Sequence, residues 1–134
     1  MSKIRFAASL IVLVAFAFAA TASRSVWDGV YSKPQATRGE KAYSSQCARC
    51  HGEALLGGEN SPPLADKDFL EKWYGKPVSN LVELTRTQMP SDGPGKLSRR
   101  VCTDIIAYVL SANGFPAGES ELDSGEGILI QPKP

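Results

Sequence analysis

Residues 46–53 read Q-C-A-R-C-H-G-E, and this stretch constrains the chain more than any other. It holds two of the three cysteines and the only histidine of the 134 residues. Cys47 and Cys50 stand three positions apart, so on a helix they share one face, roughly 4.5 Å apart along its axis. His51 follows directly. The motif therefore presents two thiols and one imidazole within a single turn.

C-x-x-C-H is the attachment pattern of a c-type haem. Each thiol can bond to one vinyl group at the haem edge, and the imidazole of His51 can then ligate the iron. A structural zinc site that also uses Cys102 is one alternative, but adjacent Cys50 and His51 suit a tetrahedral ion poorly. A redox-active dithiol is another, but no βαβ pattern surrounds the two cysteines. Haem attachment is the preferred interpretation.

The first 22 residues have the features of a signal peptide. Lys3 and Arg5 precede an apolar run from Phe6 to Ala20, and Ala20-Thr21-Ala22 supplies a cleavage site of small residues. The alternative is a retained membrane anchor, although the 17 residues from Phe6 to Ala22 are at the lower limit for a membrane span. Either reading predicts export, and the expected location is the periplasm.

Removal of residues 1–22 would leave 112 residues, enough for one domain. Their 13 basic and 14 acidic side chains give a net charge of −1. Basic runs interleaved with aromatic residues are absent, so the composition argues against a nucleic-acid partner. After cleavage the chain also has no membrane segment, and we expect a monomer.

The periodicity of apolar residues predicts an all-α domain of about four helices with long loops. One helix begins at Ser32, where Ser32-Lys33-Pro34-Gln35 matches a capping box. A short helix is capped by Asp66, and a third covers 78–87. The last helix begins after its cap at Ser98 and ends before Gly114. The glycine- and proline-rich segments 52–65 and 89–95 are predicted loops, and wrapping a haem would explain their length.

Met89 is the only methionine after residue 22. It lies 38 residues after His51, in a loop stiffened by Pro90. Core packing is the ordinary role of a methionine, but His/Met pairs ligate haem iron in cytochromes c. We therefore expect His51 and Met89 to be the two axial ligands.

The chain resembles the class I c-type cytochromes over residues 34–114. The resemblance rests on Cys47, Cys50, His51 and the Met89-Pro90 dipeptide. Softer matches are S-P-P-L at 61–64 and D-I-I-A-Y-V-L at 104–110. It implies the cytochrome c fold around one covalent haem c and its iron.

The resemblance also implies roles for residues around the haem. Gly39 and Tyr43 should pack against Ile105 and Tyr108 where the two terminal helices cross. The Pro62 carbonyl should accept a hydrogen bond from His51 Nδ1.

Trp73 and Thr87 should contact the haem propionates. The alternative for both is an ordinary packing or turn residue.

The segments outside the resemblance are an N-terminal arm, 23–33, and an acidic tail, 115–134. In the tail, only Ile128-Leu129-Ile130 is expected to return to the domain, as a short extended piece. If Cys47 and Cys50 hold haem, Cys102 cannot form an internal disulfide. Cys102 is expected to be a small buried apolar residue, and a disulfide-linked dimer is the alternative.

A haem whose two axial positions are filled has no open site for a substrate, so we expect electron transfer and no enzymatic activity. The alternative is a haem enzyme that reduces peroxide when Met89 leaves the iron. The resemblance implies redox partners such as a periplasmic dehydrogenase, for example a quinoprotein, or a terminal oxidase. Lys96, Arg99 and Arg100 could steer an acidic partner towards the haem edge.

Overall fold

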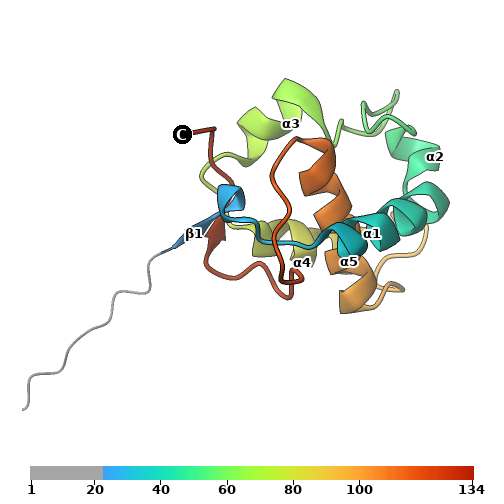
Figure 1. Cartoon of the computed structure of the whole chain (residues 1–134). Coiled ribbons are helices and arrows are strands. Elements are labelled where there is room, and N and C mark those ends of the chain that lie inside the picture. Colours follow the sequence, from blue (N-terminus) through green and yellow to red (C-terminus); the bar gives the residue numbers. More distant parts are fainter. Residues whose placement is uncertain (1–22) are drawn as a thin grey trace, which may run out of the picture.

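The computed structural model describes residues 23–134. The proposed signal peptide, 1–22, lies outside the described residues. The α-helices of this part are α1 (Lys33–Gln46), α2 (Ala48–His51), α3 (Asp66–Trp73), α4 (Val78–Gln88) and α5 (Arg99–Ala112). A 3₁₀ turn, η1 (Val26–Asp28), and two short strands, β1 (Arg24–Ser25) and β2 (Ile128–Leu129), complete the elements. The predicted all-α class is confirmed, with α2 as an extra single turn (Figure 1).

The caps of the two long helices follow the predictions. The hydroxyl of Ser32 accepts a hydrogen bond from the backbone N–H of Gln35, and that of Ser98 accepts one from Val101 N–H. Gly114, just after α5, has a φ of +80°. The prediction for α3 was wrong in detail, because Ala65 is its N-cap and Asp66 is its first residue.

Helices α1 and α5 cross at Gly39, and the crossing is the main contact between helices. A Cβ at Gly39 would lie 1.8 Å from the carbonyl oxygen of Asp104 and 3.0 Å from Cβ of Tyr108. The rings of Tyr43 and Tyr108 pack beside it with centroids 5.3 Å apart. A glycine is needed here because the backbones approach too closely for any side chain.

The arm and the tail pack together against the helices. Strands β1 and β2 pair in parallel, with Arg24 opposite Ile128, and Figure 1 shows both segments crossing the same side of the helices. The N–H of Gly75 donates to the Ile130 carbonyl, and the N–H of Ile130 donates to the Lys76 carbonyl. The expected return of residues 128–130 is therefore observed, but the expectation that no other part of the tail returns was wrong, because Phe115 and Leu122 are also buried against the domain.

The core is continuous from the helices into these terminal segments. From the arm and tail it includes Val26, Val30, Tyr31, Phe115, Leu122, Ile128 and Ile130, all buried. Tyr31 donates its hydroxyl hydrogen to the Phe115 carbonyl at 2.5 Å. Among the residues that the structure describes, no helix has the length and apolar character needed to cross a membrane.

Candidate haem-attachment site

The C-x-x-C-H motif lies at the junction of α1 and α2, on one helical turn. The N–H groups of Cys50 and His51 both donate to the carbonyl of Cys47, at 3.1 and 2.9 Å. Cys50 is exposed and Cys47 is partly exposed, and neither forms a disulfide. Burial raises the pKa of Cys47 to about 11, so its thiol is protonated at neutral pH. The turn thus presents two free thiols close to the surface.

His51 is buried, with 8% of its surface exposed, and its ring is fixed by one hydrogen bond. Nδ1 lies 2.8 Å from the carbonyl oxygen of Pro62. A carbonyl can only accept a hydrogen bond, so Nδ1 must carry the proton. In the neutral ring, Nε2 is then the nitrogen with the lone pair, and this is the form of histidine that binds a metal. This is the contact that the resemblance implies for Pro62.

The loop between α2 and α3 holds Pro62 in place. The N–H of Gly57 donates to the His51 carbonyl at 2.9 Å, and the N–H of Leu64 donates to the Leu55 carbonyl at 2.8 Å. The hydroxyl of Tyr43 donates to the Gly52 carbonyl at 2.7 Å. The sequence did not indicate this hydrogen bond of Tyr43, for which only packing at the crossing of the terminal helices was expected.

Met89 is the first residue after α4 and is partly buried. Its N–H donates to the Thr85 carbonyl in the last turn of α4. Met89 thus begins the loop that leads to α5. Arg49, between the two cysteines, donates to the carboxylate of Asp92 in this loop at 2.5 Å. The hydrogen bond from Arg49 lowers the pKa of Asp92, so this carboxylate is ionised at neutral pH. The structure therefore joins the motif turn to the methionine loop.

Trp73 and Thr87 line the same surface depression, of about 460 Å³, beside α4. Trp73 is buried at the end of α3, and Lys76 Nζ lies 5.3 Å from the centroid of its ring. Thr87 is exposed, and its hydroxyl donates to the Glu83 carbonyl within α4 at 2.7 Å. Trp73 and Thr87 therefore line one depression together with Lys76, whose ammonium group suits a carboxylate ligand.

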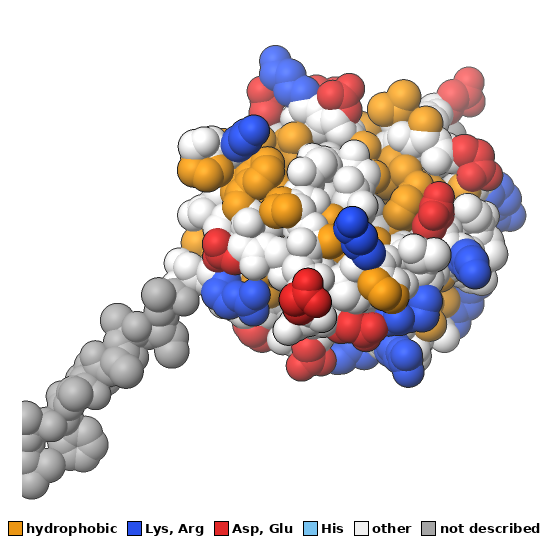
Figure 2. Space-filling model, viewed as in Figure 1, with side chains coloured by type: hydrophobic (Ala, Val, Ile, Leu, Met, Phe, Trp, Pro, Cys, Tyr) orange, Lys and Arg blue, Asp and Glu red, His pale blue; other side chains and the backbone are white. Residues whose placement is uncertain are grey.

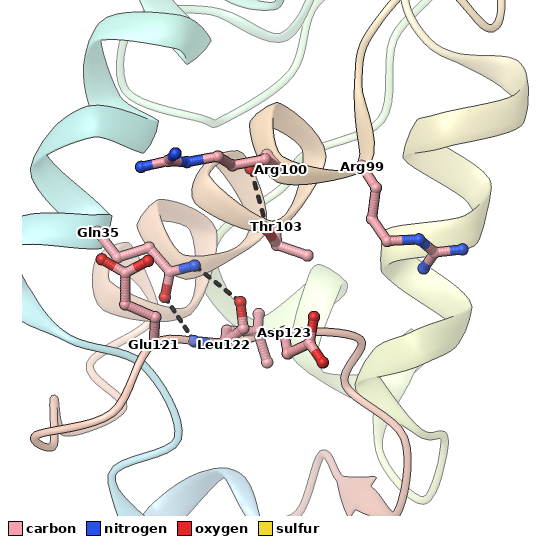
Figure 3. Close-up of a pocket in the computed structure, with 7 residues that line it drawn as sticks. All are labelled: Gln35, Arg99, Arg100, Thr103, Glu121, Leu122 and Asp123. Atoms are coloured by element: carbon pink, nitrogen blue, oxygen red, sulfur yellow. Dashed lines mark hydrogen bonds between the residues drawn. The ribbon is translucent and has the colours of Figure 1, made fainter.

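A second cavity, of about 380 Å³, lies between α1, α5 and the tail. It contains none of the predicted site residues. Gln35 exchanges two hydrogen bonds with the backbone of Leu122 across it, while Arg99 points away towards α4 (Figure 3). Gln35 therefore fixes the tail, instead of completing the capping box expected at the start of α1.

The cations after the methionine loop are partly neutralised. Arg99 lies 3.8 Å from Glu83, and Arg100 shares the second cavity with Glu121 and Asp123. On the face shown in Figure 2, acidic and basic side chains are interspersed, and hydrophobic side chains reach the surface in the upper half. Of the three cations that could steer a partner, Arg99 is therefore the one paired with a carboxylate at close range.

Cys102 is completely buried in α5, as expected for a small apolar residue. Within residues 23–134, no three His, Cys, Asp or Glu side chains gather to hold a metal ion. The zinc alternative therefore finds no support there. The donors that are present, an imidazole nitrogen and a thioether sulfur, suit haem iron, and the paired thiols suit its covalent attachment.

A helical fold with this motif turn defines a c-type cytochrome domain. The family model described as "Cytochrome C oxidase, cbb3-type, subunit III" matches residues 34–109. This is more than half of the chain, and the chain belongs to that family. Membership implies a covalently bound haem c with its iron, and electron transport as the role of the domain.

Curated relatives support the same family. The chain is 39% identical over 103 residues to the cbb3-type cytochrome c oxidase subunit FixP of Rhizobium meliloti (strain 1021), covering 68% of this chain and 35% of the relative. It is 28% identical over 95 residues to subunit CcoP of Rubrivivax gelatinosus, covering 69% and 31%. The chain thus spans about a third of the length of these relatives.

Among solved structures, a chain of the sulfane dehydrogenase SoxCD from Paracoccus pantotrophus is similar over 66% of this chain and 53% of that chain. The identity is 21% and the TM-score is 0.49. This likeness is distant, and the family match is what establishes the assignment.

Proposed function

We propose that this protein transfers single electrons through one haem c bound covalently by Cys47 and Cys50. His51 and Met89 are the proposed axial ligands. The observation that supports this most is the 2.8 Å contact between His51 Nδ1 and the Pro62 carbonyl. In the neutral imidazole it makes Nε2 the nitrogen available to iron, on the helical turn that also carries two free thiols, and haem attachment and ligation require both.

Each proposed residue has a distinct task. The Pro62 carbonyl holds the proton on Nδ1, orients the imidazole and raises its basicity. The thioether of Met89 is a soft, neutral ligand that favours ferrous iron and raises the reduction potential relative to a second histidine. When bound, haem c supplies the one-electron chemistry, and a fixed pair of ligands keeps reorganisation small in both oxidation states.

Trp73 and Thr87 are proposed to contact the haem propionates. Their shared depression, with Lys76 at its edge, supports this assignment. The Trp73 indole N–H and the Lys76 ammonium are donors suited to carboxylates. A role in packing alone would leave the reduction potential of a Trp73→Phe variant unchanged.

The proposed domain plan is a signal peptide at 1–22, an arm at 23–33, the cytochrome domain at 34–114 and the tail at 115–134. Residues 1–22 direct export to the periplasm, where the protein acts as a monomeric shuttle and not as an enzyme. The names of the relatives favour a cbb3-type terminal oxidase as the electron acceptor. A periplasmic dehydrogenase, such as a quinoprotein, would serve as the donor.

The proposal is tested by expressing the chain with residues 1–22 in a bacterial host that attaches haem c. The intact mass of the exported protein should rise by one haem that survives extraction with acidified solvent. Cys47→Ala combined with Cys50→Ala should abolish this increase, while Cys102→Ala should retain it. A wild-type protein exported without haem from such a host would refute the proposal.

A further inference from the structure

An ion pair links the two segments that hold the proposed axial ligands. A guanidinium nitrogen of Arg49 lies 2.5 Å from a carboxylate oxygen of Asp92. Arg49 stands between the two cysteines of the motif, and Asp92 follows Met89 by three residues. The pair therefore joins the turn that carries His51 to the loop that carries Met89.

The methionine loop has few other anchors. The N–H of Met89 donates to Thr85 of α4, and the N–H of Gly93 donates to the Pro90 carbonyl within the loop. Over the described residues 23–134, the Arg49–Asp92 pair is the one hydrogen bond that runs from residues 89–96 to a segment other than α4. Without this pair, no hydrogen bond would join residues 90–96 to another segment of the described chain.

The two ends of the pair differ in rigidity. Thioethers at Cys47 and Cys50 would fix the backbone of Arg49 on both sides. Asp92 lies in a loop with two glycines and two prolines between residues 90 and 95. A contact from a fixed turn to a loop restricts the positions that the loop can sample, and this lowers the entropic cost of holding Met89 in one place.

We propose that Arg49 is a positioning residue that, through Asp92, keeps the Met89 thioether on the iron. This inference rests on the proposed function, because it requires Met89 ligation. Arg49 needs no contact with the haem for this role. The side chains are 76% and 54% exposed, so the effect is that of a surface ion pair and is modest in size.

The test uses the oxidised, haem-loaded protein and imidazole, which can bind the iron only after Met89 leaves. Loss of the long-wavelength sulfur-to-iron absorption band reports the exchange. Arg49→Gln and Asp92→Asn should each increase the rate roughly two- to five-fold. The double variant should be no faster than the faster single variant, because both changes remove the same contact.

Glu71→Gln is the matched control. It removes one negative charge and breaks the exposed Lys67–Glu71 pair, whose atoms lie 3.6 Å apart within α3. Its exchange rate should equal that of the wild type. The charge-swapped protein, Arg49→Asp with Asp92→Arg, should return most of the way to the wild-type rate.

Single variants that exchange at the wild-type rate, or a double variant whose effect is the product of the two singles, would overturn the role of Arg49. That failure is distinct from a failure of the proposed function. A wild-type protein that carries haem but lacks the sulfur-to-iron band before imidazole is added would refute Met89 ligation itself, and the inference would fall with it.

Discussion

Replacing Gly39 with alanine tests the crossing of α1 and α5. The new Cβ would lie 1.8 Å from the Asp104 carbonyl oxygen, whereas real Cβ atoms essentially never come within 3.0 Å of another atom. The helices must therefore separate by about 1.2 Å. Overpacking of this kind costs about 1–3 kcal/mol and sometimes more, while alanine gains about 1 kcal/mol of helix propensity. Because the obstacle is backbone and cannot rotate away, we take the upper end of this cost, about 3 kcal/mol, and expect a net loss of about 2 kcal/mol.

The assay is urea unfolding of the haem-loaded protein, followed by circular dichroism. The midpoint should fall while the slope against urea stays constant, since the same surface is exposed on unfolding. Ser44→Ala, at an exposed position of the same helix, is the control and should be neutral or slightly stabilising. A Gly39→Ala protein as stable as the wild type would refute the close approach of the two backbones.

Four further changes test other parts of the structure. Ile130→Ala removes a completely buried side chain of the tail and should cost about 2–4 kcal/mol in urea unfolding; an unchanged midpoint would show that the tail adds nothing to the core. Arg86 holds the pKa of Glu83 below its ordinary value, so the pair should stabilise the protein when the pH is above that ordinary pKa and lose this effect as the pH falls. Glu83→Gln should therefore lose less stability than the wild type between neutral pH and pH ~3. Curves of stability against pH that run parallel for the two proteins would contradict this. Met89→Ala should keep its haem, lose the sulfur-to-iron band and have a lower reduction potential, and an unchanged potential would remove Met89 from the site. The wild type should run as a monomer on non-reducing gels because Cys102 is buried, and a dimer band lost in Cys102→Ser would show that this thiol reaches the surface.

Features that depend on neighbours in the sequence were predictable. Helix α5 begins after Ser98 and ends before Gly114, because a cap residue and a terminating glycine act within one turn. The turn at Cys47 to His51 follows from its spacing in the same way. Gly39 was expected to pack where the two terminal helices cross, and the structure places the backbone of Asp104 against it.

Features that depend on distant segments could not be predicted. Arg24 at the start of the arm pairs with Ile128 near the end of the tail. Strands of two residues are too short to produce a detectable alternation of apolar residues in the sequence. Gln35 was expected to complete a capping box, but as a buried amide it bonds to the backbone of Leu122 instead. Buried polar groups must find partners, and the sequence does not tell which partner the fold will bring.

The Arg49–Asp92 pair belongs to the same group. Its members are 43 residues apart, and each reads in the sequence as an ordinary exposed charge. Only the folded chain brings the motif turn next to the methionine loop. Local motifs were thus enough to propose the site residues, while the contacts that position them required the structure.

The most direct test of the central claim is the visible spectrum of the purified, exported protein in its oxidised and reduced forms. The account predicts sharp bands on reduction and a weak sulfur-to-iron band in the oxidised form, which is lost in Met89→Ala. Haem bands without the sulfur signal would contradict His51/Met89 ligation and favour an open iron site. A colourless protein from a host able to attach haem would contradict the account as a whole.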